Sequence, residues 1–424
     1  MMLRLIYTLL FFLLLPFILL LFLVKSRKEK GYRQRWAERF SLFKVPLQKN
    51  SIVIHAASVG EVLLIAPLIR QILAQYPNTR LTITTFTPGG SDQVKSLFGE
   101  QVQHCYLPFD LPLLMKRFLQ QLQPKAFIIV ETELWFNLLH QLRITQIPTL
   151  LINARLSEKS ARHYRYFQAA LTEVWQGFTA VAAQDELSAM RYRDLGVPAE
   201  KVTCTGNLKF DLNLSDEVIA TYRQQKQQMF NDRPVWIAGS THAGEEKLIL
   251  EVHQQLLATY PDLLLILVPR HSARFAEVEA LVQNSGLSYQ KRSEGGIISA
   301  DTQVMLGDTM GELLKLYALA DIAFVGGSLI ERGGHNPLEP LLFKIPVISG
   351  QYTFNFKQIY QQLTLIQAVM IVESSVTSLA LALSLLLADP EAVKQYGEKG
   401  FSFLQQNRGA LQQTLALLKP YLSE

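Results

Sequence analysis

Short apolar runs alternate with amphipathic stretches along most of the chain, which is the pattern of strands joined by helices. In the first half, the runs that we interpret as buried strands are residues 51–57, 80–86, 126–130, 149–153, 179–183 and 202–205. In the second half, the corresponding runs are residues 235–238, 263–268, 303–306, 321–325 and 346–349. Strands that alternate with helices favour right-handed βαβ units and parallel sheets. The pattern therefore predicts an α/β fold with two doubly wound, Rossmann-like domains.

A polar, glutamine-rich stretch separates the two series of strands. It covers residues 215–230, has helical character without any strand, and is interpreted as a domain linker. The first domain then comprises residues 26–214 and the second comprises residues 231–424, whose end from 391 to 422 is also predicted to be helical. Two doubly wound domains that face a cleft are the simplest architecture for this order of elements.

The apolar segment at the start of the chain predicts a membrane helix. No residue from Leu5 to Val24 is charged, and a helix of this length spans about 30 Å, the thickness of the hydrocarbon layer. Lys25 and Arg27 follow this segment directly, whereas Arg4 is the one basic residue before it. The positive-inside rule then places the C-terminal side of the helix in the cytoplasm.

A cleaved signal peptide is the alternative interpretation of this segment. A signal peptide has a shorter apolar core and is followed by a cleavage site of small residues. Here lysines follow instead. We therefore predict that residues 1–25 form an uncleaved signal-anchor helix, with the rest of the chain on the cytoplasmic side of a bacterial inner membrane.

Composition and charge narrow the classes of partner and cofactor. The 424 residues contain 41 Lys plus Arg and 36 Asp plus Glu, and this small basic excess favours an anionic surface. Because the excess clusters beside the apolar helix, it indicates a membrane rather than nucleic acid. Cys105 and Cys204 form no CxxC motif, and the eight histidines form no HxxxH or HExxH pair. Neither a disulfide framework nor a metal cofactor is expected.

Ligands of open parallel sheets bind beyond the carboxyl ends of the strands, so residues just after each strand are the candidates for chemistry. Glu61 follows the first strand and is a candidate base, because its carboxylate can accept the proton of an attacking hydroxyl. Gly60 beside it allows another molecule to approach the backbone. Ser58 and Glu61 also match the S-x-x-E capping box, which spacing alone favours. At a helix start, the helix dipole is expected to keep the carboxylate ionised and weakly basic.

Two further strand ends in the first half carry charged residues. Glu131 and Glu133 follow the apolar run 126–130. Residues two apart in an extended segment lie on the same face, so both carboxylates can reach one substrate. A polar strand end or a helix cap explains them equally well. Lys209 has no special spacing, and a surface lysine is its simplest interpretation.

In the second half, two helix starts suit a phosphate. Residues 336–339 combine a cap, a proline at the first helical position and an acid in the first turn, and Glu339 offers oxygens to ribose hydroxyls. Residues 310–312 open a second helix similarly, and Arg270 can add a charge-assisted bond to the same phosphate. Ordinary capping explains each alone. The glycine-rich pieces match neither GxGxxG nor a P-loop, so binding of NAD and hydrolysis of ATP are disfavoured.

The motifs that surround these residues resemble one family. In chain order they are HAASVGE, ETELW, NARLS, GNLKFD, AGSTH, VPRH, GDTMGEL and GGHNPLEP. They resemble the 3-deoxy-D-manno-octulosonic acid (Kdo) transferases of lipopolysaccharide synthesis across nearly the whole chain. The resemblance implies a GT-B fold with an N-terminal acceptor domain, a C-terminal donor domain and final helices that cross back to the first domain. It implies an inverting transfer from CMP-Kdo to lipid IVA without a metal.

The resemblance also assigns roles to individual residues. It implies that Glu61 is the proton acceptor and that Glu131 and Lys209 stabilise the transition state. It further implies that CMP is bound by Pro269, Arg270, Met310, Gly311, Glu312, Asn336, Pro337, Leu338 and Glu339.

A stretch that interleaves basic and aromatic residues lies between Arg155 and Tyr166. We hypothesise that Arg155, Arg162 and Arg165 contact phosphates of the acceptor or of the membrane, although a solvated amphipathic helix explains the pattern nearly as well.

Other functions compatible with this pattern are a nucleotide-sugar epimerase, another two-domain transferase, or a noncatalytic membrane scaffold that binds a nucleotide. The anchor and the ASVGE block disfavour the first two. No protein partner can be inferred.

Overall fold

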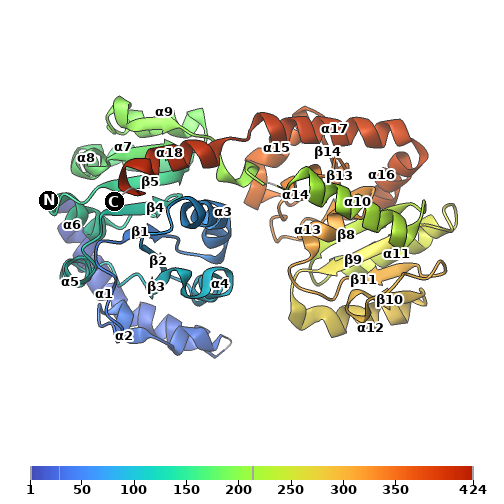
Figure 1. Ribbon diagram of the computed structural model, residues 1–424, viewed down its shortest axis with the longest axis horizontal. Helices are drawn as coiled ribbons and strands as arrows, with labels where there is room; N and C mark the ends of the chain where they lie inside the picture. The colour runs from blue at the N-terminus through green and yellow to red at the C-terminus, as the bar shows by residue number, and fades with distance from the viewer. Residues whose placement is uncertain (1, 28, 213, 423–424) are drawn as a thin grey trace. The chain divides into compact units, whose positions relative to one another are not determined.

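The computed structural model describes residues 2–27, 29–212 and 214–422, and these form two compact α/β units (Figure 1). Unit 1 comprises Met1–Asp211 and Asn407–Glu424, and unit 2 comprises Leu212–Gln406. Each unit contains one parallel sheet of seven strands with helices on its faces. The predicted fold class, two doubly wound Rossmann-like domains, is therefore confirmed.

The sheet of unit 1 has the strand order β3-β2-β1-β4-β5-β6-β7. Its strands are β1 (Ile52–His55), β2 (Leu81–Thr85), β3 (Gln103–Tyr106), β4 (Ala126–Val130), β5 (Thr149–Ala154), β6 (Ala180–Ala183) and β7 (Val202–Cys204). The central strands β1 and β4 are buried along their whole length, as expected for a parallel sheet that is covered on both faces. The chain order reverses between β1 and β4, so the carboxyl ends of these two strands border the position where such folds bind ligands.

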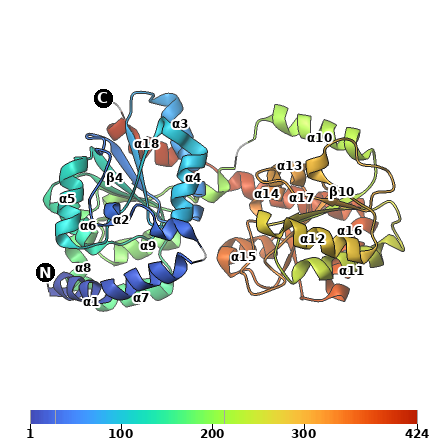
Figure 2. The same ribbon diagram turned by 90° about the horizontal axis from the view of Figure 1, so that it is seen from below.

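Helices cover both faces of this sheet. The helices of unit 1 are α1 (Met2–Lys25), α2 (Trp36–Arg39), α3 (Val59–Gln75), α4 (Pro88–Phe98), α5 (Pro112–Leu122), α6 (Phe136–Ile144), α7 (Glu158–Tyr166), α8 (Gln168–Gly177), α9 (Glu186–Asp194) and α18 (Ala410–Leu422). Figure 2 shows α3 and α4 on one side of the sheet and α5 and α6 on the other. One core cluster joins α3, α4 and α18 to the sheet, and a second joins α5, α6, α8 and α9 to it.

The sheet of unit 2 has the order β10-β11-β9-β8-β12-β13-β14. Its strands are β8 (Val235–Thr241), β9 (Leu264–Pro269), β10 (Tyr289–Lys291), β11 (Val304–Leu306), β12 (Ile322–Val325), β13 (Val347–Gly350) and β14 (Val369–Val372). Its helices are α10 (Asp216–Phe230), α11 (Glu245–Leu257), α12 (Phe275–Ser285), α13 (Leu313–Ala318), α14 (Leu338–Leu341), α15 (Lys357–Leu365), α16 (Val376–Ala388) and α17 (Pro390–Gln406). The reversal of chain order falls between β8 and β12.

The structure draws the boundaries between the units differently from the sequence analysis at two places. The stretch expected as a linker, residues 215–230, is helix α10 of unit 2, where Lys226 forms an ion pair with Asp321. We expect the second domain to run to residue 424, with final helices that return toward the first domain. In the structure the chain leaves unit 2 after Gln406, and of the final helices α18 returns to unit 1 and packs on α3. The carboxylate of Asp211 holds this return, since it accepts hydrogen bonds from the backbone N–H groups of Gly409 (2.8 Å) and Leu411 (2.6 Å).

Helix α1 contains a span from Arg4 to Lys25 with a mean hydropathy of 2.8, long and apolar enough to cross a membrane. One side of the helix packs on unit 1: the Tyr7 ring lies 5.0 Å from that of Phe136 between centroids, and Phe22 packs edge-on against Phe86. The opposite side carries apolar side chains that are half or more exposed, among them Leu9, Phe12 and Phe17. An apolar surface of this size requires a partner such as lipid.

Candidate active site

Glu61 lies in the first turn of α3, just beyond the carboxyl end of β1. Its Oε2 accepts a hydrogen bond from the backbone N–H of Ala57 (2.7 Å), and its Oε1 accepts one from the Ser58 hydroxyl (3.0 Å). Ser58 begins the helix, but its side chain caps no backbone N–H group. The predicted capping box is therefore not formed, because Glu61 accepts from the N–H of Ala57 and not from that of the N-cap residue Ser58. The Ser58 hydroxyl orients the carboxylate of Glu61 instead.

Burial raises the pKa of Glu61 to about 7, and the nearby carboxyl groups of Glu133 and Glu131 add to this rise, against the hydrogen bonds from Ala57 and Ser58. The expectation that the helix start keeps this carboxylate strongly ionised and weakly basic is wrong, because desolvation outweighs the donors at the helix end. A carboxylate with a pKa near neutral is suited to take a proton from a hydroxyl and later release it.

Glu131 directly follows β4 and has a strained backbone. Its φ is +62°, in the left-handed region that costs an L-residue about 1 kcal/mol or more. A hydrogen bond from its N–H to the carbonyl of Ile152 (2.9 Å) holds it there. Because this residue begins a turn, Glu131 and Glu133 do not lie on one extended segment, contrary to the prediction. Strain of this kind, at the carboxyl end of a central strand, is typical of functional positions.

Lys209 lies in a single 3₁₀ turn, Leu208–Phe210, beyond the end of β7. Its Nζ is 4.0 Å from Oε1 of Glu131, and both side chains are about one-quarter exposed. Burial lowers the pKa of Lys209, Arg155 lowers it further, and Glu131 opposes both. The side chain of Asn153 fixes the turn by accepting a hydrogen bond from the N–H of Leu208 (2.9 Å). Lys209 is thus a partly buried member of a charged cluster and not an isolated surface lysine.

The structure therefore brings the three residues with implied catalytic roles to one edge of the unit 1 sheet. Glu61 and Glu131 are close enough for their charges to interact, and Glu131 pairs with Lys209. Arg155 joins this cluster through its effect on Lys209. The other two arginines of the basic and aromatic stretch lie on the outer surface: Arg162 pairs with Glu158 (3.1 Å) and Arg165 with Asp194 (3.2 Å), and all four side chains are exposed.

In unit 2, the completely buried Glu245 organises the equivalent edge of the sheet. Its carboxylate accepts hydrogen bonds from the backbone N–H groups of His242 (2.9 Å), Gly327 (2.7 Å), Ser328 (3.0 Å) and Leu329 (3.0 Å). It thereby fixes the loop after β12 against the loop after β8. The sequence analysis did not identify Glu245. Acidic residues are common in the first turn of a helix because they interact favourably with the helix dipole, so the sequence alone gives Glu245 no further role.

Three histidines meet beside these loops, and the sequence analysis gave them no role. The Nε2 atoms of His242 and His335 are 2.8 Å apart, with ring planes nearly parallel, and the ring of His271 lies 5.3 Å from that of His242. At this separation one nitrogen must donate a proton and the other must accept it. Burial, and then neighbouring cationic groups that include Arg270, lower the pKa of His242 to about 4 and that of His335 to about 3. Both rings are therefore neutral near pH 7, and the positive charge of neighbouring arginines such as Arg270 and Arg332 is what favours an anion here.

The segment 336–339 lies beside these histidines. The side chain of Asn336 accepts a hydrogen bond from the N–H of Leu338 (3.1 Å) and donates one to Glu339 (3.3 Å). Burial raises the pKa of Glu339, and Arg270 opposes this rise. The predicted cap exists, but α14, which begins at Leu338 after Pro337, is a single turn of four residues. Side-chain cations therefore supply most of the positive potential expected from a longer helix.

The remaining residues that are predicted to bind the nucleotide lie at the ends of β9 and β11. Pro269 is the last residue of β9, and the exposed Arg270 follows it. Met310 is 63% exposed and Gly311 has a φ of +83°. Glu312 directly precedes the short helix α13 and forms an ion pair with Arg292 (3.1 Å). The structure thus places all the residues predicted to bind the nucleotide at the carboxyl edge of the unit 2 sheet. The carboxylate of Glu312 is already paired with an arginine there.

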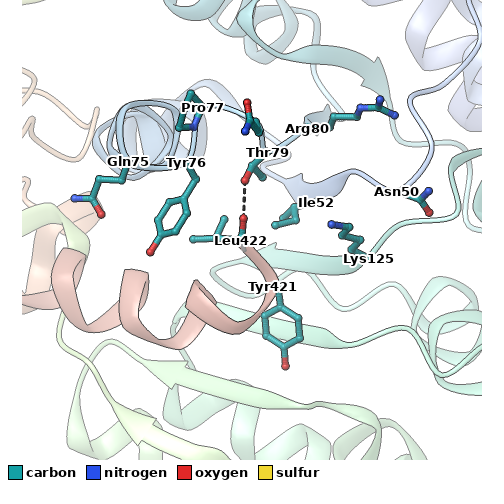
Figure 3. Close-up of a pocket in the computed structure, with 11 residues that line it drawn as sticks. Asn50, Ile52, Gln75, Tyr76, Pro77, Thr79, Arg80, Lys125, Tyr421 and Leu422 are labelled. Carbon is teal, nitrogen blue, oxygen red and sulfur yellow. Dashed lines mark hydrogen bonds between the residues drawn. The ribbon is translucent and has the colours of Figure 1, made fainter. Parts of the chain in front are cut away.

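A pocket of about 520 Å³ lies at the amino ends of the unit 1 strands, at the edge of the sheet opposite to Glu61 and Glu131 (Figure 3). Ile52, Arg80 and Lys125 from the amino ends of β1, β2 and β4 line it, and the Thr79 hydroxyl donates a hydrogen bond to the carbonyl of Leu422 there (2.8 Å). It contains none of the predicted site residues. Ligands of parallel sheets bind at the carboxyl ends, so this pocket is not the candidate active site.

Comparisons with known proteins link these features to sequence families. Residues 34–212 match the family described as 3-deoxy-D-manno-octulosonic-acid transferase (kdotransferase), and residues 232–403 match glycosyl transferases group 1. The 3-deoxy-D-manno-octulosonic acid transferase of Haemophilus influenzae is 48% identical over 99% of both chains.

Solved structures that resemble this chain share its fold at low sequence identity. A glycosyltransferase from Rickettsia africae is 12% identical, with a TM-score of 0.54 over 89% of this chain and 99% of its own. A UDP-GlcNAc 2-epimerase from Neisseria meningitidis is 17% identical, with a TM-score of 0.54 over 87% of this chain and 100% of its own. Because transferases and epimerases share this fold, the fold alone does not choose between those two activities.

Proposed function

The chain belongs to the 3-deoxy-D-manno-octulosonic acid (Kdo) transferase family of glycosyltransferases, and from this premise we propose that it transfers Kdo from CMP-Kdo to lipid IVA with inversion and without a metal. The observation that carries the proposal is the cluster of Glu61, Glu131 and Lys209, in which the pKa of Glu61 is raised to about 7. Such a group is a proton acceptor matched to a hydroxyl nucleophile at neutral pH.

In the proposed reaction, a hydroxyl oxygen of the lipid attacks the anomeric carbon of Kdo, and its proton moves to the carboxylate of Glu61. The bond between that carbon and the phosphate oxygen breaks, and its electron pair leaves with CMP. Positive charge develops on the sugar in the transition state, so the negative charge of Glu131 stabilises it. Lys209 offsets negative charge on the donor's carboxylate or on the departing phosphate.

We assign donor binding to unit 2. Arg270 and the His242–His335 pair lie at the strand ends where the single phosphate of CMP would be bound, and Glu339 offers oxygens to the ribose hydroxyls. One phosphate carries less charge than a pyrophosphate, so side-chain cations suffice to stabilise it. Of the residues that the structure describes, no three His, Cys, Asp or Glu side chains are grouped to hold a metal ion.

We further propose that α1 anchors the protein in a bacterial inner membrane with both units on the cytoplasmic side. The exposed apolar side of α1 supports insertion into lipid. Lys25 and Arg27 at its C-terminal end support this orientation. An enzyme that acts on a lipid acceptor gains from this location, because the acceptor stays in the membrane.

The proposal is tested by incubating the detergent-solubilised, full-length protein with CMP-Kdo and lipid IVA and identifying the products by mass spectrometry and NMR. We expect Kdo-bearing lipid with inverted anomeric configuration. Glu61→Gln should lower turnover by about 10²-fold or more and keep CMP binding, whereas the exposed Glu173→Gln should match the parent protein. Consumption of nucleotide sugar without acceptor would indicate an epimerase. CMP binding without any lipid product would indicate a scaffold.

A further inference from the structure

Arg39, the last residue of the short helix α2, is a buried charge in unit 1. The residue is 1% exposed. Three aromatic rings enclose its guanidinium, whose Cζ lies 4.2 Å from the ring centroid of Tyr106, 4.9 Å from that of Phe22 and 5.1 Å from that of Phe86. Burial lowers the pKa of Arg39 to about 10, against the opposing effect of Tyr106, so the group stays protonated near pH 7.

The guanidinium of Arg39 is only partly satisfied by hydrogen bonds. Its Nη2 donates to the carbonyl of Phe86 (2.9 Å), whereas Nε and Nη1 are buried and have no hydrogen-bond partner among the described residues. Buried donors without partners destabilise the folded state, and an apolar side chain of similar volume often serves stability equally well. The bond to Phe86 is therefore the contribution of Arg39 that an apolar side chain would lack.

The carbonyl of Phe86 belongs to a peptide group that is joined to the candidate proton acceptor. The N–H of the same peptide group, on Thr87, donates to the carbonyl of Ala57 (3.0 Å). The N–H of Ala57 donates in turn to Oε2 of Glu61 (2.7 Å). Hydrogen bonds in such a chain polarise and strengthen one another. Arg39 thus fixes, through the loop after β2, the residue that orients the carboxylate of Glu61.

Helix α1 supplies one wall of the site that holds Arg39. From residue 4 to residue 25, Phe22 is the one buried side chain of this helix, at 5% exposed. Its ring lies 6.1 Å from that of Phe86 and 5.3 Å from that of Tyr32 between centroids, packed edge-on against both. The apolar helix therefore reaches the same peptide group as Arg39.

We propose that Arg39 is a positioning residue, which acts on the proton acceptor through Phe86 and Ala57. Phe22 holds the guanidinium in place, so α1 takes part in the reaction as well as in attachment to the membrane. This inference rests on the proposed function, because it takes Glu61 as the proton acceptor.

The expected consequence is a change in the acidity of Glu61. The hydrogen bond from Ala57 lowers the pKa of Glu61 against the effect of burial. Without Arg39 this bond weakens, so the pKa rises and the carboxylate is lost at a higher pH. The charged groups that face Glu61, namely Glu133 and Glu131, stay in place.

The experiment compares variants of the full-length, detergent-solubilised protein with CMP-Kdo and lipid IVA. Arg39→Met should move the acidic limb of kcat/KM to higher pH by about 0.5–1 unit. It should also lower kcat about tenfold, because the base is less well oriented, and leave the KM for CMP-Kdo unchanged. Arg39→Lys should recover part of the loss, since its ammonium group can still donate to Phe86.

Phe22→Ala separates position from charge, because it keeps the charge of Arg39. The limb should move in the same direction by a smaller amount. Phe17→Ala is the matched control, as Phe17 lies on the exposed side of the same helix, and it should behave like the parent protein. An unmoved limb in Phe22→Ala would overturn the part assigned to α1.

Two measurements without substrate complete the test. Arg39→Met should keep the parent's midpoint of chemical denaturation, because its apolar side chain fills the same space, but hydrogen exchange at residues 56–61 should be faster. A lower midpoint with an unmoved limb would make the role of Arg39 purely structural and overturn the proposal, and so would unchanged exchange. A parent protein without transfer activity would overturn the proposed function, whereas the exchange measurement would still decide whether Arg39 orders this loop.

Discussion

Glu61 is subject to two opposing influences, and their balance decides what it can do. Donors at the start of α3 favour its ionised form, whereas burial and the carboxyl groups of Glu131 and Glu133 favour its protonated form. Burial wins and places the pKa near 7. At one pH unit below this value about a tenth of the Glu61 side chains carry a charge, so a reaction that needs the carboxylate slows in acid.

We predict that Glu133→Gln shifts the acidic limb of the activity profile to lower pH. The charge of Glu133 raises the pKa of Glu61. Its removal lowers that pKa, and the carboxylate then persists in more acidic solution. The measurement is kcat/KM from pH 5 to pH 9, and the position of the limb is compared independently of the maximal rate. Glu173→Gln, which alters a carboxylate paired on the surface with Arg143, should leave the limb in place. An unmoved limb in Glu133→Gln would refute the electrostatic coupling.

The backbone of Glu131 leads to a second prediction, in which stability and activity change in opposite directions. Glycine adopts a φ of +62° without the strain of an L-residue, so Glu131→Gly should raise the free energy of unfolding by about 0.5–1 kcal/mol. The partly exposed ion pair with Lys209 that is lost contributes little. Turnover should nevertheless fall on the order of a hundredfold, because the carboxylate is absent. Chemical denaturation and initial rates provide the two measurements.

Gln146→Gly is the matched control for this variant. Gln146 also has a positive φ, +55°, but lies exposed after α6, away from the charged cluster. It should gain similar stability and keep full activity. A less stable Glu131→Gly protein would mean that the carboxylate serves the fold and not the reaction.

At the residue scale, the sequence placed candidate residues correctly after their strands, while their catalytic roles stay predictions. The place of Glu61 after its strand marked it as a candidate, whereas only the family resemblance marked Lys209. Prediction from sequence failed where a contact joins residues that are distant in the chain. His242 and His335 are far apart in the chain, and no local pattern places their Nε2 atoms 2.8 Å apart. The four backbone donors to Glu245 are equally invisible without the fold.

Among the elements, position in the sheet decided which strands the apolar pattern identified. Central strands such as β4 are buried on both faces and appear as continuous apolar runs. The three strands absent from the prediction, β3, β10 and β14, all lie at sheet edges. An edge strand pairs on one side only and tolerates polar residues, as in β10 (Tyr289–Lys291) with its sequence YQK. Glu61 and Glu131 follow the central strands β1 and β4, which the pattern identified, whereas Lys209 follows β7, an edge strand that was identified as well.

One carboxylate caps the helix with which the chain returns to unit 1, and Asp211→Ala tests what this cap contributes. Asp211 caps the start of α18 with two hydrogen bonds, and loss of such a cap costs about 1 kcal/mol. Because α18 packs on α3, which carries Glu61, we expect faster hydrogen exchange in both helices and slower turnover. Asp389→Ala removes a comparable cap from α17, where Asp389 accepts bonds from the N–H groups of Glu391 and Ala392. Its effect should be confined to unit 2.

At the scale of the whole molecule, each unit has its own sheet and its own buried core, so ligand binding and stability can be assigned to the units separately. Apolar periodicity predicted this division but not its boundaries. A polar amphipathic helix such as α10 has the same pattern whether it links domains or packs on one. Similarly, nothing in the periodicity of residues 391–422 marks the break at which the chain changes units.

The assignment of donor binding to unit 2 predicts where CMP protects the protein. A ligand that binds the folded state stabilises it by about 2.7 kcal/mol at a hundred times its dissociation constant. Hydrogen exchange with CMP should therefore slow in the loops after β8, β9, β11 and β12, and it should slow equally in Glu61→Gln. We expect the same protection in EDTA, because the guanidinium of Arg270 provides positive charge there and the neutral rings of His242 and His335 can offer hydrogen bonds. Protection confined to the loops of unit 1 would reverse the assignment, since the anion would then bind among Lys209 and Arg155 and not beside His242 and His335.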